Sequence, residues 1–165
     1  MILVLLYVLT IPAANWLIGH VGTTCVPDGP CLIPVLPGLM APSGVLMIGA
    51  ALLLRDLVQR RYGPAVSLAA IAAGVVISFV VAPPALALAS AAAFAISELS
   101  DLAVYTPLVR RGFALAVVLS CVAGAAIDSA AFLWLAFGSL QHVAGQVVGK
   151  TYAAVAFLAY RRLSA

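Results

Sequence analysis

The stretch AFAISELSDLAVYTPLVRRG, residues 93–112, joins a long apolar run to two acids and a terminal arginine pair. Glu98 and Asp101 stand three positions apart, so both lie on one face if the run is helical. A charged side chain near the middle of a bilayer costs about 2.5–3.5 kcal/mol on insertion scales. We therefore expect these two acids to face the interior of a helical bundle rather than lipid.

The whole chain has the composition of an integral membrane protein. Of its 165 residues, 65% are hydrophobic and 8% are charged, and the mean hydropathy is +1.23. A soluble domain carries about a quarter charged residues. The apolar runs are continuous rather than alternating with a period of two, which favours helices over a barrel. The basic residues do not gather into an aromatic-rich surface, so no nucleic-acid partner is predicted.

Six apolar runs approach the length of about 20 residues that a membrane span requires. We predict an all-α integral membrane protein, a bundle of six transmembrane helices that forms a single domain over residues 1–165. The predicted spans cover about 2–19, 41–58, 64–82, 85–107, 113–137 and 143–160.

Arginine pairs predict the orientation of these spans. They follow the second, fourth and sixth runs, and the other connections contain no Lys or Arg. The pairs are Arg60-Arg61, Arg110-Arg111 and Arg161-Arg162. Because basic loops stay in the cytoplasm, both chain termini are predicted to be cytoplasmic, in a multi-pass protein of the cell membrane. The first run lacks a basic leader, which favours a retained helix over a cleaved signal peptide.

The segment after the first run is rich in Pro and Gly. Cys25 and Cys31 flank the sequence VPDGP there, which is typical of a tight turn. The loop is predicted to lie outside the cytoplasm, where a disulfide forms readily, but two free thiols remain an alternative. Only His20 lies close enough to assist a metal, so neither a metal site nor a cofactor is predicted. Cys121, inside an apolar run, is predicted to be a packing residue.

Further polar residues recur in the other predicted spans. Together, five ionisable groups facing lipid would cost on the order of 10 kcal/mol, as much as the net stability of many domains. Small residues flank several of them and allow close helix approach or space for a ligand. The predicted substrate-binding set is Asn15, Asp56, Glu98, Asp101, Asp128 and Lys150.

Some of these charges have obvious partners. Lys150 and Asp128 are expected to pair, and Asp56 is within helical reach of Arg60. Arg55 is expected to extend to the cytoplasmic surface. The interior acids still outnumber the interior bases. Unpaired acids in a membrane cavity usually bind a substrate or carry a proton, although buried pairs that only set helix register are the alternative.

The chain lacks the common catalytic motifs. The sequence contains no GxxxxGK[ST], HExxH or GxSxG pattern, so we predict that it is not an enzyme. Trp134 and Phe132 are expected to pack or to lie at the membrane interface, with stacking on a planar ligand as the alternative.

Four segments carry a family resemblance: LLLRDLVQRRYG (52–63), FAISELSDLAVYTPLVRRG (94–112), GAAIDSAAFLWLAFG (124–138) and GKTYAAVAFLAY (149–160). In this order they resemble the VUT family of queuosine-precursor transporters, the YhhQ type. The resemblance implies import of 7-deazaguanine bases, preQ0 or preQ1, across the cytoplasmic membrane. The partners it implies are a purine-like small molecule and the lipid bilayer, and a homo-oligomer is left open.

The chemistry of such a base agrees with the polar set. A carboxylate accepts two neighbouring N–H donors side by side, so we expect Glu98 or Asp101 to take the guanine edge. Asp128 and Lys150 would then position the other side of the base. Two alternatives remain, namely a substrate-binding membrane subunit of an energy-coupled importer and a non-transporting structural membrane protein.

Overall fold

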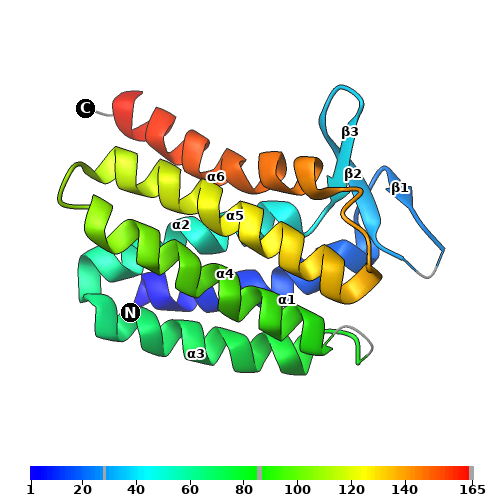
Figure 1. Cartoon of the computed structure of the whole chain (residues 1–165), viewed down its shortest axis with the longest axis horizontal. Helices are drawn as coiled ribbons and strands as arrows, with labels where there is room; N and C mark the ends of the chain where they lie inside the picture. The colour runs from blue at the N-terminus through cyan, green and yellow to red at the C-terminus, as the bar shows by residue number, and fades with distance from the viewer. Residues whose placement is uncertain (28, 85–86, 164–165) are drawn as a thin grey trace.

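The computed structural model describes residues 1–27, 29–84 and 87–163, which form a bundle of long helices with a small sheet at one end (Figure 1). The helices are α1 (Ile2–His20), α2 (Val45–Tyr62), α3 (Pro64–Val81), α4 (Ala87–Leu108), α5 (Phe113–Phe137) and α6 (Val143–Leu163). Each corresponds to one predicted span, and the predicted start of the fourth span at 85 lies outside the described residues. The mostly helical fold is confirmed.

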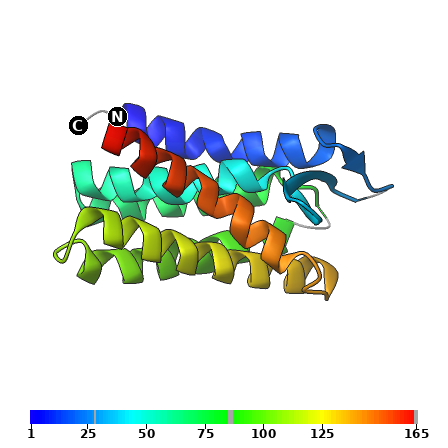
Figure 2. The same cartoon turned by 90° about the horizontal axis from the view of Figure 1, so that it is seen from above.

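Four helices of the described chain are long and apolar enough to cross a membrane: α1, α3, α4 and α5. The 18 residues of α2 instead include an acid and three arginines. Helix α1 begins, and α6 ends, at the end of the bundle opposite the sheet (Figures 1 and 2). The side chains of Arg161 and Arg162 lie outside the described residues. Six spans and cytoplasmic termini therefore stay predictions.

A three-stranded antiparallel sheet stands where a turn-rich loop was expected, so the all-α prediction is wrong for this segment. Its strands are β1 (Thr24–Cys25), β2 (Cys31–Leu36) and β3 (Leu39–Pro42), in the order β1-β2-β3. Gly38, at a φ of 75°, makes the tight turn between β2 and β3 that favours glycine. Val35 and Ala41 of the sheet pack against Val45 of α2, which attaches the sheet to the bundle.

The sheet contains the two cysteines that the sequence left undecided. Cys25 of β1 and Cys31 of β2 form a disulfide and are paired in the strand register. The Tyr152 hydroxyl of α6 donates a hydrogen bond to the carbonyl oxygen of Val35. The sheet is thus connected to the last helix as well as to the second.

Glycines set how closely the central helices cross. A Cβ added at Gly49 of α2 would lie 2.1 Å from the carbonyl oxygen of Lys150 on α6. A Cβ at Gly124 of α5 would lie 3.0 Å from that of Asp101 on α4. Small residues at such crossings let helix backbones approach closely in a membrane. Both crossings place an ionisable side chain in the interior of the bundle.

Candidate functional site

A cavity opens inside the bundle near the sheet. It is bordered by all six helices and by the end of β3. Its volume is about 80 Å³, several times the 10–15 Å³ that one buried water occupies on this measure. Most of the lining is apolar, as in typical small-molecule sites. The polar lining residues are Asn15, Ser78, Ser90, Asp128, Gln146 and Lys150.

Lys150 organises one side of the cavity. Its ammonium group donates to Asp128 Oδ2 at 2.5 Å, to Gln146 Oε1 at 2.7 Å and to Ser129 Oγ at 2.9 Å. These three bonds use all three donors of the ammonium group. The predicted pair of Lys150 and Asp128 is confirmed. The Asp128 side chain keeps 10% of its surface accessible, so this acid can also meet a molecule in the cavity.

Asn15 and the aromatic residues form the other walls. The Asn15 amide nitrogen donates to the Ile11 carbonyl oxygen at 3.0 Å, which leaves the amide oxygen as the acceptor that Asn15 offers. Phe94 and Phe132 both line the cavity, whereas 62% of Trp134 is exposed. The two aromatic side chains of the cavity therefore come from α4 and α5.

Gln146 is a lining residue that the sequence analysis missed. It lies one helical turn before Lys150 and accepts a hydrogen bond from it, and it is buried. Its spacing of four residues from a membrane-buried lysine is the signal that could have identified it, because such neighbours meet on one helix face.

Arg55 lies at the centre of a second buried polar group of the bundle. Its side chain is fully buried and pairs with Asp56 at 2.8 Å, with Glu98 at 3.6 Å and with Asp101. It also donates to the Gln59 side chain at 2.9 Å. We call Arg55, Asp56, Glu98 and Asp101 the Arg55 cluster. The expectation that Arg55 reaches the cytoplasmic surface is wrong, because α4 presents its two acids directly to α2.

Asp56 also has partners other than the predicted Arg60. Besides Arg55, it accepts a hydrogen bond from Ser120 Oγ at 3.0 Å and a weak one from Cys121 Sγ at 4.0 Å. The Arg60 guanidinium instead lies 4.0 Å from the ring centre of Phe113. The predicted pair of Asp56 and Arg60 is therefore wrong.

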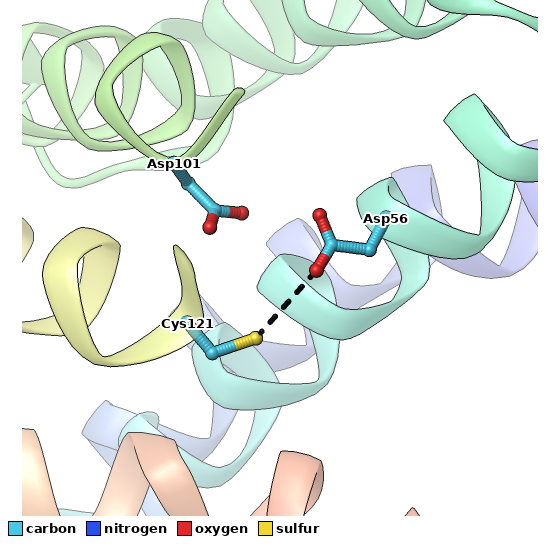
Figure 3. Close-up of side chains that lie close together, drawn as sticks. All are labelled: Asp56, Asp101 and Cys121. Carbon is cyan, nitrogen blue, oxygen red and sulfur yellow. Dashed lines mark hydrogen bonds between the residues drawn. The ribbon is translucent and has the colours of Figure 1, made fainter. Parts of the chain in front are cut away.

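Figure 3 shows Asp56, Asp101 and Cys121 approaching one another from α2, α4 and α5. Their ligand atoms lie within 4.8 Å of one another, a spacing that could hold a metal ion. However, the Arg55 guanidinium already pairs with both of these carboxylates. A cation is thus already present between the two acids, and we assign no metal here.

The structure divides the predicted residues into two neighbouring groups. Asn15, Asp128 and Lys150 line the cavity, whereas Asp56, Glu98 and Asp101 surround Arg55 and do not belong to the cavity lining described above. Asp128 remains within electrostatic reach of Glu98. A change of charge in the cavity would therefore change the electrostatic potential in the Arg55 cluster.

Comparison with known proteins adds one finding. The family model described as "Putative vitamin uptake transporter" matches residues 80–161, about half of the chain. The matched region contains α4, α5 and most of α6, and with them Glu98, Asp101, Asp128 and Lys150. No curated protein and no solved structure matches the chain.

Proposed function

Because the chain belongs to the vitamin uptake transporter family, we propose that it imports a queuosine precursor, a 7-deazaguanine base such as preQ0 or preQ1, across the cell membrane. Membership of this family and the four apolar helices make the chain a multi-pass membrane transporter for a vitamin-like substrate. The narrower substrate assignment rests on the resemblance of the polar motifs and on the chemistry of the cavity.

The observation that carries the proposal is a mostly apolar cavity with a few fixed hydrogen-bonding groups. A 7-deazaguanine presents N–H donors beside a carbonyl acceptor along one edge. The Asp128 carboxylate accepts such donors. The Gln146 amide nitrogen, whose neighbouring oxygen accepts from Lys150, donates to the carbonyl. The Asn15 amide oxygen supplies an acceptor from α1. Apolar walls remove water from the base and strengthen these polar contacts.

The Arg55 cluster has a different role in this proposal. Glu98 and Asp101 are already paired with a fully buried guanidinium, and neither of them lines the cavity. We therefore assign direct substrate contact to Asn15, Asp128 and Gln146, with Lys150 fixing the positions of Asp128 and Gln146. Asp56, Glu98 and Asp101 do not contact the substrate in this proposal. They pair with Arg55, and they influence the cavity through the electrostatic potential at Asp128.

The test is uptake of radiolabelled preQ0 and preQ1 by liposomes that contain only this chain. The Asp128→Asn variant keeps the side-chain shape but loses the charged acceptor. Losing a hydrogen bond to a charged group costs about 1.5–3 kcal/mol, so uptake at low substrate concentration should fall more than tenfold. Unchanged uptake would refute the assignment of Asp128.

A matched pair of glutamines provides the control. Gln146 lines the cavity, whereas Gln141 is exposed in the turn before α6. Gln146→Leu should weaken uptake and Gln141→Leu should not. Uptake that appears only after an ATPase partner is added would instead indicate a subunit of an energy-coupled importer. Failure to take up either base under all conditions would refute transport of these substrates.

A further inference from the structure

The Arg55 cluster has more acids than its cation can balance. One guanidinium meets three carboxyl groups, and all four side chains are at most 1% exposed. A net charge of minus two in a dry interior is very unfavourable, and such groups take up protons instead. At least one of these carboxyl groups must therefore hold a proton when the cluster is closed to water.

The groups facing the cluster come from several helices. They are Tyr7 of α1, Gln59 of α2, Tyr105 of α4, and Ser120 and Cys121 of α5. None of these is a cation at neutral pH. Within the described chain, Lys150 is committed to Asp128, and Arg60 lies over the Phe113 ring. A proton is therefore the balancing charge that fits this cluster best.

Tyr7 is an independent sign of a ligand at this place. Its side chain is fully buried and lies beside the Glu98 carboxyl group. Neither the Tyr7 hydroxyl nor Glu98 Oε2 has a hydrogen bond of normal geometry. A buried hydroxyl without a partner costs about 1–3 kcal/mol. Gain or loss of a proton on Glu98 changes which of the two groups donates, so this pair is suited to either charge state.

The cluster is also placed to respond to the substrate. Glu98 and Asp101 share one face of α4, the helix whose Ser90, Ala93 and Phe94 line the cavity. Asp128 acts electrostatically on Glu98. When a bound molecule engages the Asp128 carboxylate, the negative potential at Glu98 falls, and the stability of a proton there changes with it.

We propose that the Arg55 cluster is a proton-binding site that couples proton movement to substrate movement. One carboxylate gains an O–H bond from a proton on the outer side and loses that proton to the inner side, so no other reactant is required. The inference rests on the proposed transport function. Arg55 already holds the position between Asp56 and Asp101 that a metal ion would need, which argues against sodium as the coupling ion.

The test uses the full chain in liposomes that contain a pH-sensitive dye, with preQ0 as the substrate because its nitrile is uncharged. With the membrane potential held at zero, an acidic outer medium should drive net uptake and acidify the interior. For one proton per substrate, each pH unit should give about a tenfold accumulation. Exchange of labelled for unlabelled preQ0, without any gradient, measures binding and movement alone.

Variants then locate the proton site. In Asp101→Asn and Glu98→Gln, proton-driven accumulation should be lost, and exchange should fall less than in Asp128→Asn. Asp128→Asn, a change of the same kind in the cavity, should lose both. If a cluster variant does not insert, Tyr7→Phe removes only one hydroxyl and should shift the outer pH at which uptake is half-maximal. An unchanged midpoint would contradict the role given to Glu98.

The outcomes separate the two proposals. If neither exchange nor uptake occurs, the transport proposal itself fails. If exchange and uptake occur but do not depend on the pH gradient, the transport proposal is supported and the proposal of proton coupling is overturned. A sodium gradient that drives accumulation would likewise overturn it.

Discussion

Replacing Arg55 by Met tests whether a buried guanidinium holds α2 and α4 together. Met keeps a similar length and removes the charge, so three buried carboxyl groups lose the cation to which all of them are paired. Removing one partner of a buried ion pair costs about 3–5 kcal/mol because the remaining charge is left uncompensated. For a chain of this length, that loss corresponds to a fall of roughly 6–20 °C in the melting temperature.

Cys121 provides the assay. It is free and buried, so it should react with a fluorescent thiol reagent only when the bundle opens. Heating the detergent-solubilised protein in the presence of this reagent reports unfolding. Arg60→Met is the matched control on the same helix, because Arg60 is exposed and its contact with the Phe113 ring is worth no more than about 1 kcal/mol.

A second change makes the test quantitative. Asp101→Asn added to Arg55→Met removes one of the uncompensated charges, so the double variant should recover about 0.5–3 kcal/mol relative to the sum of the single changes. If Arg55→Met melts no lower than Arg60→Met, then Arg55 does not lie among the three acids, and the reasoning about the Arg55 cluster fails.

Two further predictions concern other parts of the fold. Gly49→Ala should destabilise the protein by at least 1–3 kcal/mol, because the new Cβ would lie 2.1 Å from the Lys150 carbonyl oxygen and force α2 and α6 apart. Gly19→Ala, which meets nothing within 4 Å, is the control in the same melting assay, and equal melting of the two variants would contradict the close crossing. Cys25→Ser combined with Cys31→Ser opens a loop with a sequence separation of 6 and should cost about 2 kcal/mol. Limited proteolysis should then cut the sheet faster than in the parent protein, and an unchanged rate would show that packing alone holds the sheet.

The Lys150 pair and the Arg55 cluster show why some ion pairs follow from sequence and others do not. Lys150 has no short path to the surface, so an acid at a similar depth on a neighbouring helix is its natural partner. Arg55 lies five positions before Arg60, close to a predicted cytoplasmic end, and a long side chain there can equally extend to water. Only the packing of α4 against α2 decides between these alternatives.

The sheet between α1 and α2 was not predicted from the sequence, for a related reason. Its strands are short, with two, six and four residues, and several prolines and glycines lie in or between them. Such strands have no stability alone and exist because they pair with one another and pack on α2. The disulfide of Cys25 and Cys31 adds a link that the spacing of the two cysteines permits but does not require.

The number and type of the long helices follow from the lengths and positions of the apolar runs in the sequence. The need to shelter their charges follows too, since lipid excludes unpaired polar groups wherever they occur along the chain. The tertiary structure decides which charges pair and how the polar set divides between the cavity and the Arg55 cluster. Both depend on close helix crossings at glycines, which bring residues from different helices within a few ångströms. Electrostatic energies in a dry interior change steeply over such distances, so those partners emerge only once the helices are packed.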